Sequence, residues 1–240
     1  MTTLKPLTVY GHWGAPNPWK VKIILEELRV PHEWREVEFN NVKSEEYLKV
    51  TPNGRLPAIQ DPNTGTTLWE SGAIILYLID EYDKEGKLSY KHGPEKYLTQ
   101  QWLMFQVSDQ LTHPVPILTG QGPYFGQATW FARFHPERLP SATTRYINEI
   151  ERVISVLDLT LSRNEDGDSA YLVGNKCTYA DLSFVTWANV GKGLLIQLGE
   201  QGRLDKFENY RRWMERLEER SVVKSANERI EKGRKAHNLP

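Results

Sequence analysis

The strand and helix signals of this chain are divided unevenly, and the break falls in one charged, glycine-containing segment, residues 83–93. Before this segment, short apolar runs typical of strands alternate with helical periodicity; after it, the strand signals largely vanish. A chain of 240 residues is long enough for one large domain or two ordinary ones. We therefore expect an α/β domain over residues 1–84, a linker, and an all-helical domain over residues 94–240.

The first part predicts a β-α-β unit followed by a β-β-α unit, the pattern of a small mixed α/β sandwich. Apolar residues at positions i, i+3, i+4 and i+7 mark residues 19–30 as an amphipathic helix. The helix that begins at Ser71 is apolar almost all round, which indicates a buried helix. Strands are expected at residues 7–10, 32–39, 57–59 and 66–69, with a helical turn at 44–50.

The second part predicts a set of helices. Residues 141–162 show the clearest pattern, with isoleucine and leucine residues along one stripe. Two segments rich in glycine or other turn-forming residues, 120–127 and 164–170, are interpreted as loops. The other helices are expected at residues 95–118, from Thr178 onward, and from residue 205 to about residue 220.

Composition and charge argue against several classes of function. With 30 basic and 31 acidic residues the net charge is -1, so there is no electrostatic reason to expect nucleic acid or an anionic membrane as a partner. The one cysteine, Cys177, cannot form an internal disulfide. We find no signal peptide, no apolar run long enough to span a bilayer, and no metal site. By elimination, we expect a cytoplasmic protein.

Pro57 stands immediately before a predicted strand, where a proline cannot donate to the hydrogen-bond ladder. A cis Leu56–Pro57 bond would turn the preceding peptide group away from the sheet and toward a ligand. The ligand suited to such a group is an extended peptide, paired main chain to main chain. Taken alone, the proline is better explained by an ordinary trans turn.

Glu70, Ser71 and Gly72 open the apolar helix, and we expect Ser71 to be its N-cap. Helix N-termini bind carboxylates through unpaired N–H groups and a partial positive charge. Glu70 beside that end could hold an ammonium group. Glu70 and Ser71 together therefore suit the free α-amino acid end of a ligand. The alternative is a plain serine cap next to a solvated glutamate, and Pro57 upstream makes this alternative less favoured.

The loop HWGAPNPWK, residues 12–20, leads into the first helix. A thiol placed at that helix end would have a lowered pKa, and the side-chain amide of Asn17 can donate a hydrogen bond to it. Because the loop contains no Cys or Ser, the sulfur must come with the ligand. Tyr10 and His12 are alternatives for activating the thiol, although Tyr10 is expected to pack in its strand and His12 to be a surface or loop residue.

At this point the sequence resembles a known family. The segments NGRLPAI (53–59), WESGAIILYL (69–78) and YLVGNKCTYADLSF (171–184) are together similar to cytosolic glutathione transferases, and the resemblance covers nearly the whole chain. It implies a thioredoxin-like first domain, an all-α second domain and a two-fold homodimer. It also implies that glutathione is the co-substrate, with no other cofactor.

The resemblance implies a role for each matching residue. Leu56 offers its backbone to the cysteinyl part of glutathione after the cis Pro57, Glu70 and Ser71 hold the γ-glutamyl end, and Arg55 assists. The segments 15–21, 120–137 and 140–146 narrow the resemblance to the fungal nitrogen-regulator-like subgroup, related to the nu class. In that subgroup an asparagine contacts the sulfur, and Asn17 matches it, although Pro18 stands where glycine is usual. A histidine or glutamine that reaches the glycyl carboxylate is replaced here by Val42, and Lys43 is our substitute.

Two further features belong to the helical part. Thr178 and Asp181 match the family's capping box, a structural element in which the two side chains satisfy N–H groups at a helix start. Aromatic residues could line a pocket for an electrophile, although helix core or dimer contact is the better explanation for any one of them. These residues are Trp13, Tyr124, Phe125, Trp130, Phe131 and Phe134.

We therefore expect a glutathione transferase that activates the thiol of bound glutathione for attack on electrophiles, disulfides or peroxides. The alternative is a non-catalytic, transferase-like regulatory or protein-binding module on the same fold. The sequence names neither the second substrate nor the dominant reaction.

Overall fold

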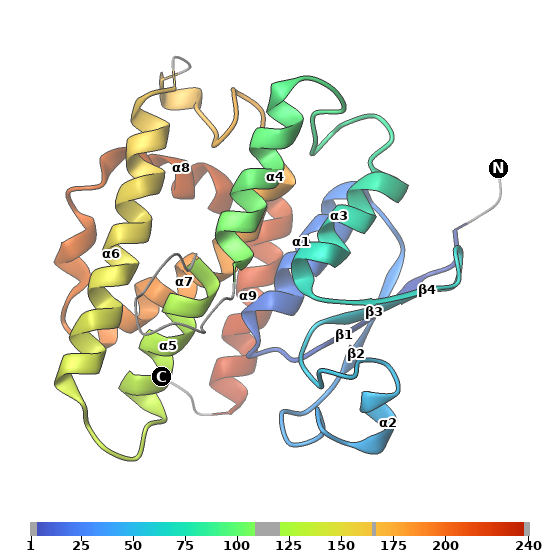
Figure 1. The fold of residues 1–240 in the computed structure, drawn as a ribbon, viewed down its shortest axis with the longest axis horizontal. Coiled ribbons are helices and arrows are strands. Elements are labelled where there is room, and N and C mark those ends of the chain that lie inside the picture. The colour runs from blue at the N-terminus through green and yellow to red at the C-terminus, as the bar shows by residue number, and fades with distance from the viewer. Residues whose placement is uncertain (1–3, 109–120, 165–166, 238–240) are drawn as a thin grey trace. The chain divides into compact units, whose positions relative to one another are not determined.

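The computed structural model describes residues 4–108, 121–164 and 167–237 (Figure 1). The chain divides into two compact units, one formed by Met1–Ser89 with Glu218–Pro240 and the other by Tyr90–Leu217. The division between residues 89 and 90 falls inside the segment expected to be a linker. The final segment packs with the first unit, whereas the sequence analysis assigned it to the helical domain.

A four-stranded sheet organises the first unit, with the strand order β2-β1-β3-β4. β1 is parallel to β2 with Leu7 opposite His32, and β3 is antiparallel to both β1 and β4. The parallel pair joined through a helix and the antiparallel hairpin are the two predicted units, so the predicted mixed α/β fold is confirmed. The strands are β1 (Leu7–Gly11), β2 (His32–Glu36), β3 (Ala58–Asp61) and β4 (Thr66–Trp69).

Two helices, α1 (Pro16–Leu28) and α3 (Ser71–Tyr82), contact each other and the sheet (Figure 1). α2 (Glu45–Leu48) is a single turn whose N-cap, Ser44, accepts a hydrogen bond from the backbone N–H of Tyr47. The apolar faces of α1 and α3 meet in the core, as their periodicity predicts. The fully buried side chains there include Ile23, Ile24, Ile74, Ile75 and Leu78.

A further helix, α9 (Ser221–Ala236), packs on α1 and was not predicted. Arg220, the residue before it, donates from Nε and Nη2 to the two carboxylate oxygens of Glu27 over 2.7 and 2.9 Å. The Lys87 ammonium lies 3.4 Å from the same carboxylate, whose side chain is 7% exposed. The end of the chain is therefore fixed to α1 by charge pairs, which hydrophobic periodicity does not reveal.

Glu27→Gln is expected to lower the free energy of unfolding by about 1.5 kcal/mol at neutral pH, because Arg220 loses its charged acceptor. Burial alone would raise the pKa of Glu27, but the hydrogen bond and charge of Arg220 and the charge of Lys87 hold it below its ordinary value of 4.5. This stabilisation is therefore present above pH 4.5 and is lost as the pH falls through the lowered folded-state pKa. Urea unfolding at several pH values measures it.

The control for this prediction is Glu45→Gln, because the side chain of Glu45 is 90% exposed in its pair with Lys49. Exposed pairs contribute little, so this variant should unfold like the unmodified chain. A Glu27→Gln variant as stable as the control at neutral pH would contradict the role assigned to the pair.

The second unit consists of helices. α7 is its central element, since it contacts both α4 and α5 and buries side chains along most of its length. The long helix predicted over residues 141–162 is confirmed, beginning one residue earlier. The elements are α4 (Pro94–Val107), α5 (Gln121–Arg133), α6 (Pro140–Ser162), η1 (Gly167–Ser169), α7 (Tyr179–Gln197), η2 (Gln201–Leu204) and α8 (Glu208–Glu218).

The predicted capping box at the start of α7 is confirmed. Thr178 is the N-cap. Its backbone N–H and its hydroxyl donate hydrogen bonds to one carboxylate oxygen of Asp181, over 2.8 and 2.7 Å. The second carboxylate oxygen of Asp181 accepts from the backbone N–H of Leu172 and the indole N–H of Trp213, over 2.9 and 3.0 Å. One buried carboxylate therefore joins the start of α7, the segment before it and α8.

Two predictions for this unit are wrong. The helix expected to reach Leu118 ends at Val107, and Ser108 already has extended dihedrals, φ -56 and ψ 119; residues 109–120 lie outside the described residues. The segment GQGPYFGQ, expected to be a loop, lies almost entirely within α5. A Cβ added at Gly122 or Gly126 would lie 3.6 or 3.4 Å from the ring of Trp187 on α7. These glycines therefore lie in the contact between α5 and α7 instead of in a turn.

In the first unit, two boundaries differ from the expectation. β2 ends at Glu36 instead of Phe39. The last backbone hydrogen bond between this segment and β1 is that from the Val37 N–H to the Gly11 carbonyl, over 2.8 Å. α1 begins at Pro16 instead of Trp19, because a proline in the first turn needs no backbone donor and already has a helical φ. Asn17 therefore lies within the first turn of α1.

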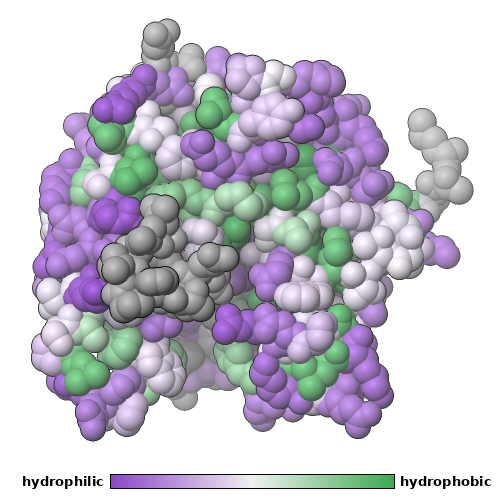
Figure 2. Space-filling model, viewed as in Figure 1, coloured by the Kyte–Doolittle hydropathy of each residue, from purple (hydrophilic) through white to green (hydrophobic). Residues whose placement is uncertain are grey.

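The face of the molecule in Figure 2 is mainly hydrophilic, with apolar residues scattered between polar ones. Across the part of the chain that the structure describes, none of the helices has the length and apolar character needed to cross a bilayer.

Candidate functional site

Four of the predicted binding residues lie together where the β3–β4 hairpin meets α3. In this hairpin Ala58 is paired with Trp69, so Pro57 before β3 and Glu70 after β4 lie at the same end. The Leu56–Pro57 bond is cis, as predicted. Ser71 then begins α3. The strand register thus brings Leu56, Pro57, Glu70 and Ser71 to one place.

The backbone at the start of α3 is strained. Glu70 has φ 71 and ψ 115, a conformation that residues other than glycine rarely adopt and that costs about 1–3 kcal/mol. Residues held in such conformations cluster at ligand sites, because the surrounding structure maintains a geometry that the ligand needs. The prediction that Ser71 is the N-cap is wrong: Glu70 occupies that position, and Ser71 is the first helical residue. Its side chain is therefore available for another role.

A chain of polar contacts leads from Glu70 to Lys43. The side-chain amide of Asn53 lies 3.5 Å from Oε1 of Glu70, and the backbone carbonyl of Asn53 accepts a hydrogen bond from Nζ of Lys43 over 2.6 Å. The backbone carbonyl of Arg55 accepts from the Tyr47 hydroxyl over 3.0 Å, and the Arg55 side chain is exposed. Two predicted cations therefore lie on the segments next to Glu70, with Asn53 as a connecting residue that the sequence analysis missed.

A second residue missed by the sequence analysis is Lys20 on α1. Its side chain is 1% exposed, and its Nζ lies 3.4 Å from Oγ of Ser71. Burial lowers the pKa of Lys20 to about 7, while the charge of Glu70 acts in the opposite direction. A signal was present in the sequence, because Lys20 is four residues before the buried Ile24 and so falls on the apolar face of its helix.

The loop before α1 is held by several hydrogen bonds. The Trp13 N–H donates to Oε1 of Glu36 over 2.9 Å, and the Trp13 carbonyl accepts from the indole N–H of Trp19 over 2.8 Å. The Ala15 N–H donates to the carbonyl of His12 over 3.0 Å. Because the loop is fixed to β2 and α1, the half-buried Asn17 in the first turn has a defined position.

The two alternative thiol-activating residues both interact with protein groups. The Tyr10 hydroxyl donates to Oε1 of Gln60 over 2.7 Å, and its ring packs in a buried cluster with Tyr47. His12 lies in the loop between β1 and α1, as expected, and its side chain is buried there. Its Nδ1 accepts from the Gly14 N–H over 3.0 Å, and its Nε2 lies 3.5 Å from the Glu38 carboxylate. Tyr10 thus packs in its strand as expected, and His12 holds the loop.

The aromatic residues considered for a substrate pocket have separate surroundings. Trp13 stacks on His237, with ring centroids 4.5 Å apart. In α5, Tyr124 and Phe125 are buried, and Phe131 stacks on Tyr146 of α6. Trp130 of α5 and Phe134, just after this helix, are exposed and stack on each other. Tyr124 and Phe125 are therefore core residues of their helix, as the simpler explanation expects, and for the exposed pair the pocket and the dimer contact both stay predictions.

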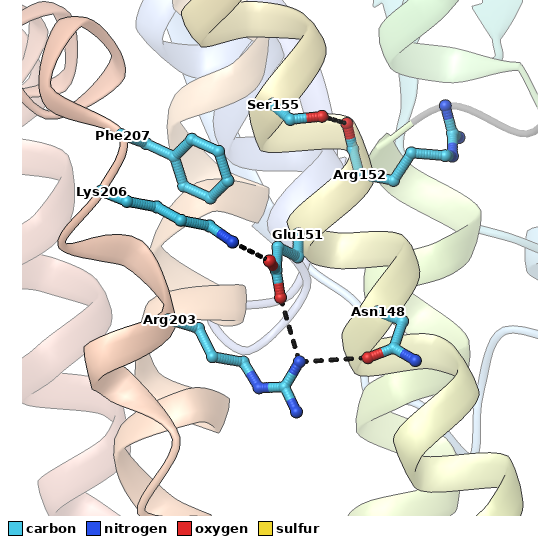
Figure 3. A pocket seen from close by; sticks show the side chains of 7 residues that line it. All are labelled: Asn148, Glu151, Arg152, Ser155, Arg203, Lys206 and Phe207. Atoms are coloured by element: carbon cyan, nitrogen blue, oxygen red, sulfur yellow. Dashed lines mark hydrogen bonds and ion pairs between the residues drawn. The ribbon is translucent and has the colours of Figure 1, made fainter.

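A cavity of about 570 Å³ lies in the helical unit and contains none of the predicted site residues (Figure 3). Glu151 of α6 pairs there with Arg203, over 3.0 Å, and with Lys206. The hydrogen bond from Lys206 is the main reason that the pKa of Glu151 lies below its ordinary value. These pairs connect α6 to the η2 segment, so the polar lining of this cavity has a structural role. Across the described ranges, no cluster of three or more His, Cys, Asp or Glu residues could hold a metal ion.

The architecture and the geometry at α3 define a glutathione transferase fold: a thioredoxin-like unit with a cis-proline, and an all-helical unit. The sequence model for "Glutathione S-transferase, N-terminal domain" matches residues 5–80, and that for the C-terminal domain matches residues 123–221. The chain is 44% identical over 227 residues to the glutathione S-transferase-like protein tpcF of Aspergillus fumigatus, with 93% of this chain and 95% of that protein covered. This chain belongs to the glutathione S-transferase family.

Two solved structures from Phanerochaete chrysosporium are also similar. The glutathione transferase URE2P6, in complex with oxidized glutathione, is 44% identical with a TM-score of 0.82, covering 95% of this chain and 97% of that one. Ure2p5, cocrystallized with 1-(S-glutathionyl)-2,4-dinitrobenzene, is 35% identical with a TM-score of 0.81, covering 97% of both chains. These similarities confirm the resemblance of this chain to the fungal nitrogen-regulator-like glutathione transferases.

Proposed function

We propose that this chain binds glutathione with its γ-glutamyl end at Glu70 and Ser71 and activates the thiol for attack on an electrophilic carbon, a disulfide or a peroxide. The observation that carries the proposal is the strained Glu70 backbone beside a buried Ser71, at the hairpin end that holds cis Pro57. The γ-glutamyl end carries one carboxylate and one ammonium group. The N-terminus of α3 with the Ser71 hydroxyl suits the carboxylate, and the Glu70 carboxylate suits the ammonium group.

The other predicted residues then receive roles along the tripeptide. The Leu56 backbone pairs with the cysteinyl part, and Arg55 and Lys43 provide positive charge for the glycyl carboxylate. The Asn17 amide donates a hydrogen bond to the sulfur at the N-terminal end of α1. Hydrogen bonding to the thiolate favours the ionised form, so the thiol proton leaves to solvent at a lower pH than in free glutathione.

The chemistry follows from this thiolate. On a carbon electrophile the sulfur forms a C–S bond and expels the leaving group with its electron pair. On a disulfide it forms a mixed disulfide and releases a thiolate; on a peroxide it takes one oxygen and releases an alkoxide or hydroxide. The ligands of the two fungal structures, oxidized glutathione and a glutathionyl conjugate, support both thiol redox and conjugation for this chain. We also propose a cytoplasmic homodimer with a glutathione-binding first unit.

The test is a turnover assay with glutathione and one probe of each class: 1-chloro-2,4-dinitrobenzene, 2-hydroxyethyl disulfide and cumene hydroperoxide. The proposal expects retention on a glutathione-affinity column and turnover of at least one probe. Retention without turnover of any probe would favour the non-catalytic, protein-binding alternative. A chain that is neither retained nor active would overturn the proposal.

Ser71→Ala is expected to weaken glutathione binding about tenfold or more while lowering the free energy of unfolding by less than about 1 kcal/mol. The reason is that Ser71 is not the cap of α3, so the helix keeps its own bonds, and that the hydrogen bond lost with Lys20 is long, at 3.4 Å. Calorimetric titration and urea unfolding measure the two effects. Ser183→Ala is the matched control, because this buried serine donates to the Tyr179 carbonyl within α7 and should not affect binding. Equal losses of binding and stability in Ser71→Ala would assign Ser71 a purely structural role.

A further inference from the structure

Lys20 is an unusual residue to find in the core of the first unit. It belongs to α1, it is 1% exposed, and its Nζ donates to the Ser71 hydroxyl oxygen at 3.4 Å. Burying an ammonium group costs free energy unless the charge is paired and hydrogen-bonded. Because Ser71 belongs to the proposed glutathione site, the contact connects Lys20 to the ligand through Ser71.

The charge that acts on Lys20 is that of Glu70. β1, which also contacts α1, carries no charged side chain between Leu7 and Gly11. Lys22, two residues further along α1, is occupied elsewhere, since its Nζ lies 2.9 Å from the Glu26 carboxylate. On α9, which also packs on α1, Arg229 pairs with Glu26, and Arg220 just before this helix pairs with Glu27. α3 carries Asp80 and Glu81, both exposed. The remaining charged residues of α9 are Lys224, Glu228, Glu231, Lys232, Arg234 and Lys235.

The direction of the hydrogen bond determines what Ser71 can do. An ammonium group is only a donor, so when Lys20 is charged the Ser71 oxygen accepts from it. The hydroxyl proton of Ser71 then points elsewhere and can be donated to a ligand carboxylate. A carboxylate arriving at Ser71 would in turn bring a second negative charge near Lys20, which favours the ammonium form.

We propose that Lys20 is a positioning residue that acts through Ser71, and that binding of the γ-glutamyl carboxylate is coupled to proton uptake by Lys20. This inference rests on the proposed function, because it requires glutathione to bind at Ser71. It adds a proton linkage that glutathione binding at Glu70 and Ser71 does not by itself require.

The sign of the linkage follows from the pKa. Burial lowers the pKa of Lys20 to about 7 without a ligand, and the ligand carboxylate raises it. Below this value Lys20 is charged before and after binding, so no proton is taken up. Above it, up to one proton is taken up, and affinity falls up to tenfold for each pH unit until the raised pKa is reached.

The test uses S-methylglutathione, whose sulfur carries no proton that could be released on binding. Calorimetric titrations in two buffers of different ionisation enthalpy give the number of protons exchanged. The unmodified chain is expected to take up close to one proton at about pH 8 and almost none at about pH 6. Lys20→Met should bind about tenfold more weakly at the lower pH and take up no proton at either.

The matched control is Lys22→Met, which removes a neighbouring buried ammonium that pairs with Glu26 and should keep the proton uptake. Thermal unfolding checks that both variants are folded, and Lys20→Arg, which stays charged, should bind without proton uptake. Two results would overturn the role of Lys20: the unmodified chain binds S-methylglutathione without proton uptake, or Lys20→Met keeps the same proton uptake. Either result would leave the proposed function intact. An unmodified chain that binds no S-methylglutathione would overturn both.

Discussion

Replacing Asp181 with alanine is expected to lower the free energy of unfolding by about 4 kcal/mol. The carboxylate is fully buried and accepts four hydrogen bonds, which come from the N–H and hydroxyl of Thr178, the N–H of Leu172 and the indole N–H of Trp213. Alanine leaves these donors without an acceptor in a place that water does not reach. Each unsatisfied buried donor costs about 1–3 kcal/mol, and local relaxation recovers part of the total.

Urea unfolding followed by circular dichroism measures this loss. The control is Asp205→Ala, since Asp205 is an exposed aspartate in the same unit and its removal should change stability by less than about 0.5 kcal/mol. If Asp181→Ala were within about 1 kcal/mol of the unmodified chain, the carboxylate would not be the connection between α7 and α8 that its hydrogen bonds indicate.

Replacing Asn17 with alanine is expected to lower kcat about 100-fold, with a KM for glutathione changed by less than about threefold. Asn17 lies in the first turn of α1, directly after a loop fixed by the Trp13 and His12 hydrogen bonds, so the backbone that carries its amide has a defined position before the ligand arrives. A donor aimed at charge that develops on the sulfur stabilises the thiolate and the transition state more than the bound thiol. Steady-state kinetics at saturating second substrate gives the two constants separately.

The comparison variant is Tyr10→Phe. The Tyr10 hydroxyl donates to Gln60 and lies in a buried cluster, so its removal should leave kcat within about threefold of the unmodified enzyme. Unchanged turnover in Asn17→Ala together with a large loss in Tyr10→Phe would transfer the thiol-activating role to the tyrosine.

Most of the first unit could be predicted from the sequence because its signals are local. The strand at Thr66–Trp69 and the buried helix from Ser71 follow from short patterns, and the capping box at Thr178 and Asp181 is set within four residues. The helix α9 could not be predicted in the same way, because its attachment to α1 depends on Arg220 and Glu27, 193 residues apart. The glycines of α5 predict a loop because glycine favours turns, and the contact of this helix with Trp187 of α7 is not visible in one segment.

The candidate site was predictable to the same extent. Pro57, Glu70 and Ser71 form recognisable local motifs, and the strand register brings them together as expected. The strained Glu70 backbone and the shift of the N-cap from Ser71 to Glu70 follow from how the hairpin joins α3, which the residue types do not specify. Lys20 was missed because a lysine on an amphipathic helix is normally solvated. Only the packing of α1 against α3 places its ammonium next to Ser71.

The central claim is that the protein lowers the pKa of a thiol that it does not itself contain. Titrating the thiolate absorbance of glutathione bound to the enzyme, against free glutathione in the same buffer, measures this directly. We predict a bound-thiol pKa about two pH units below the ordinary thiol value of about 8.5. A bound thiol that titrates at the same pH as free glutathione would contradict the claim.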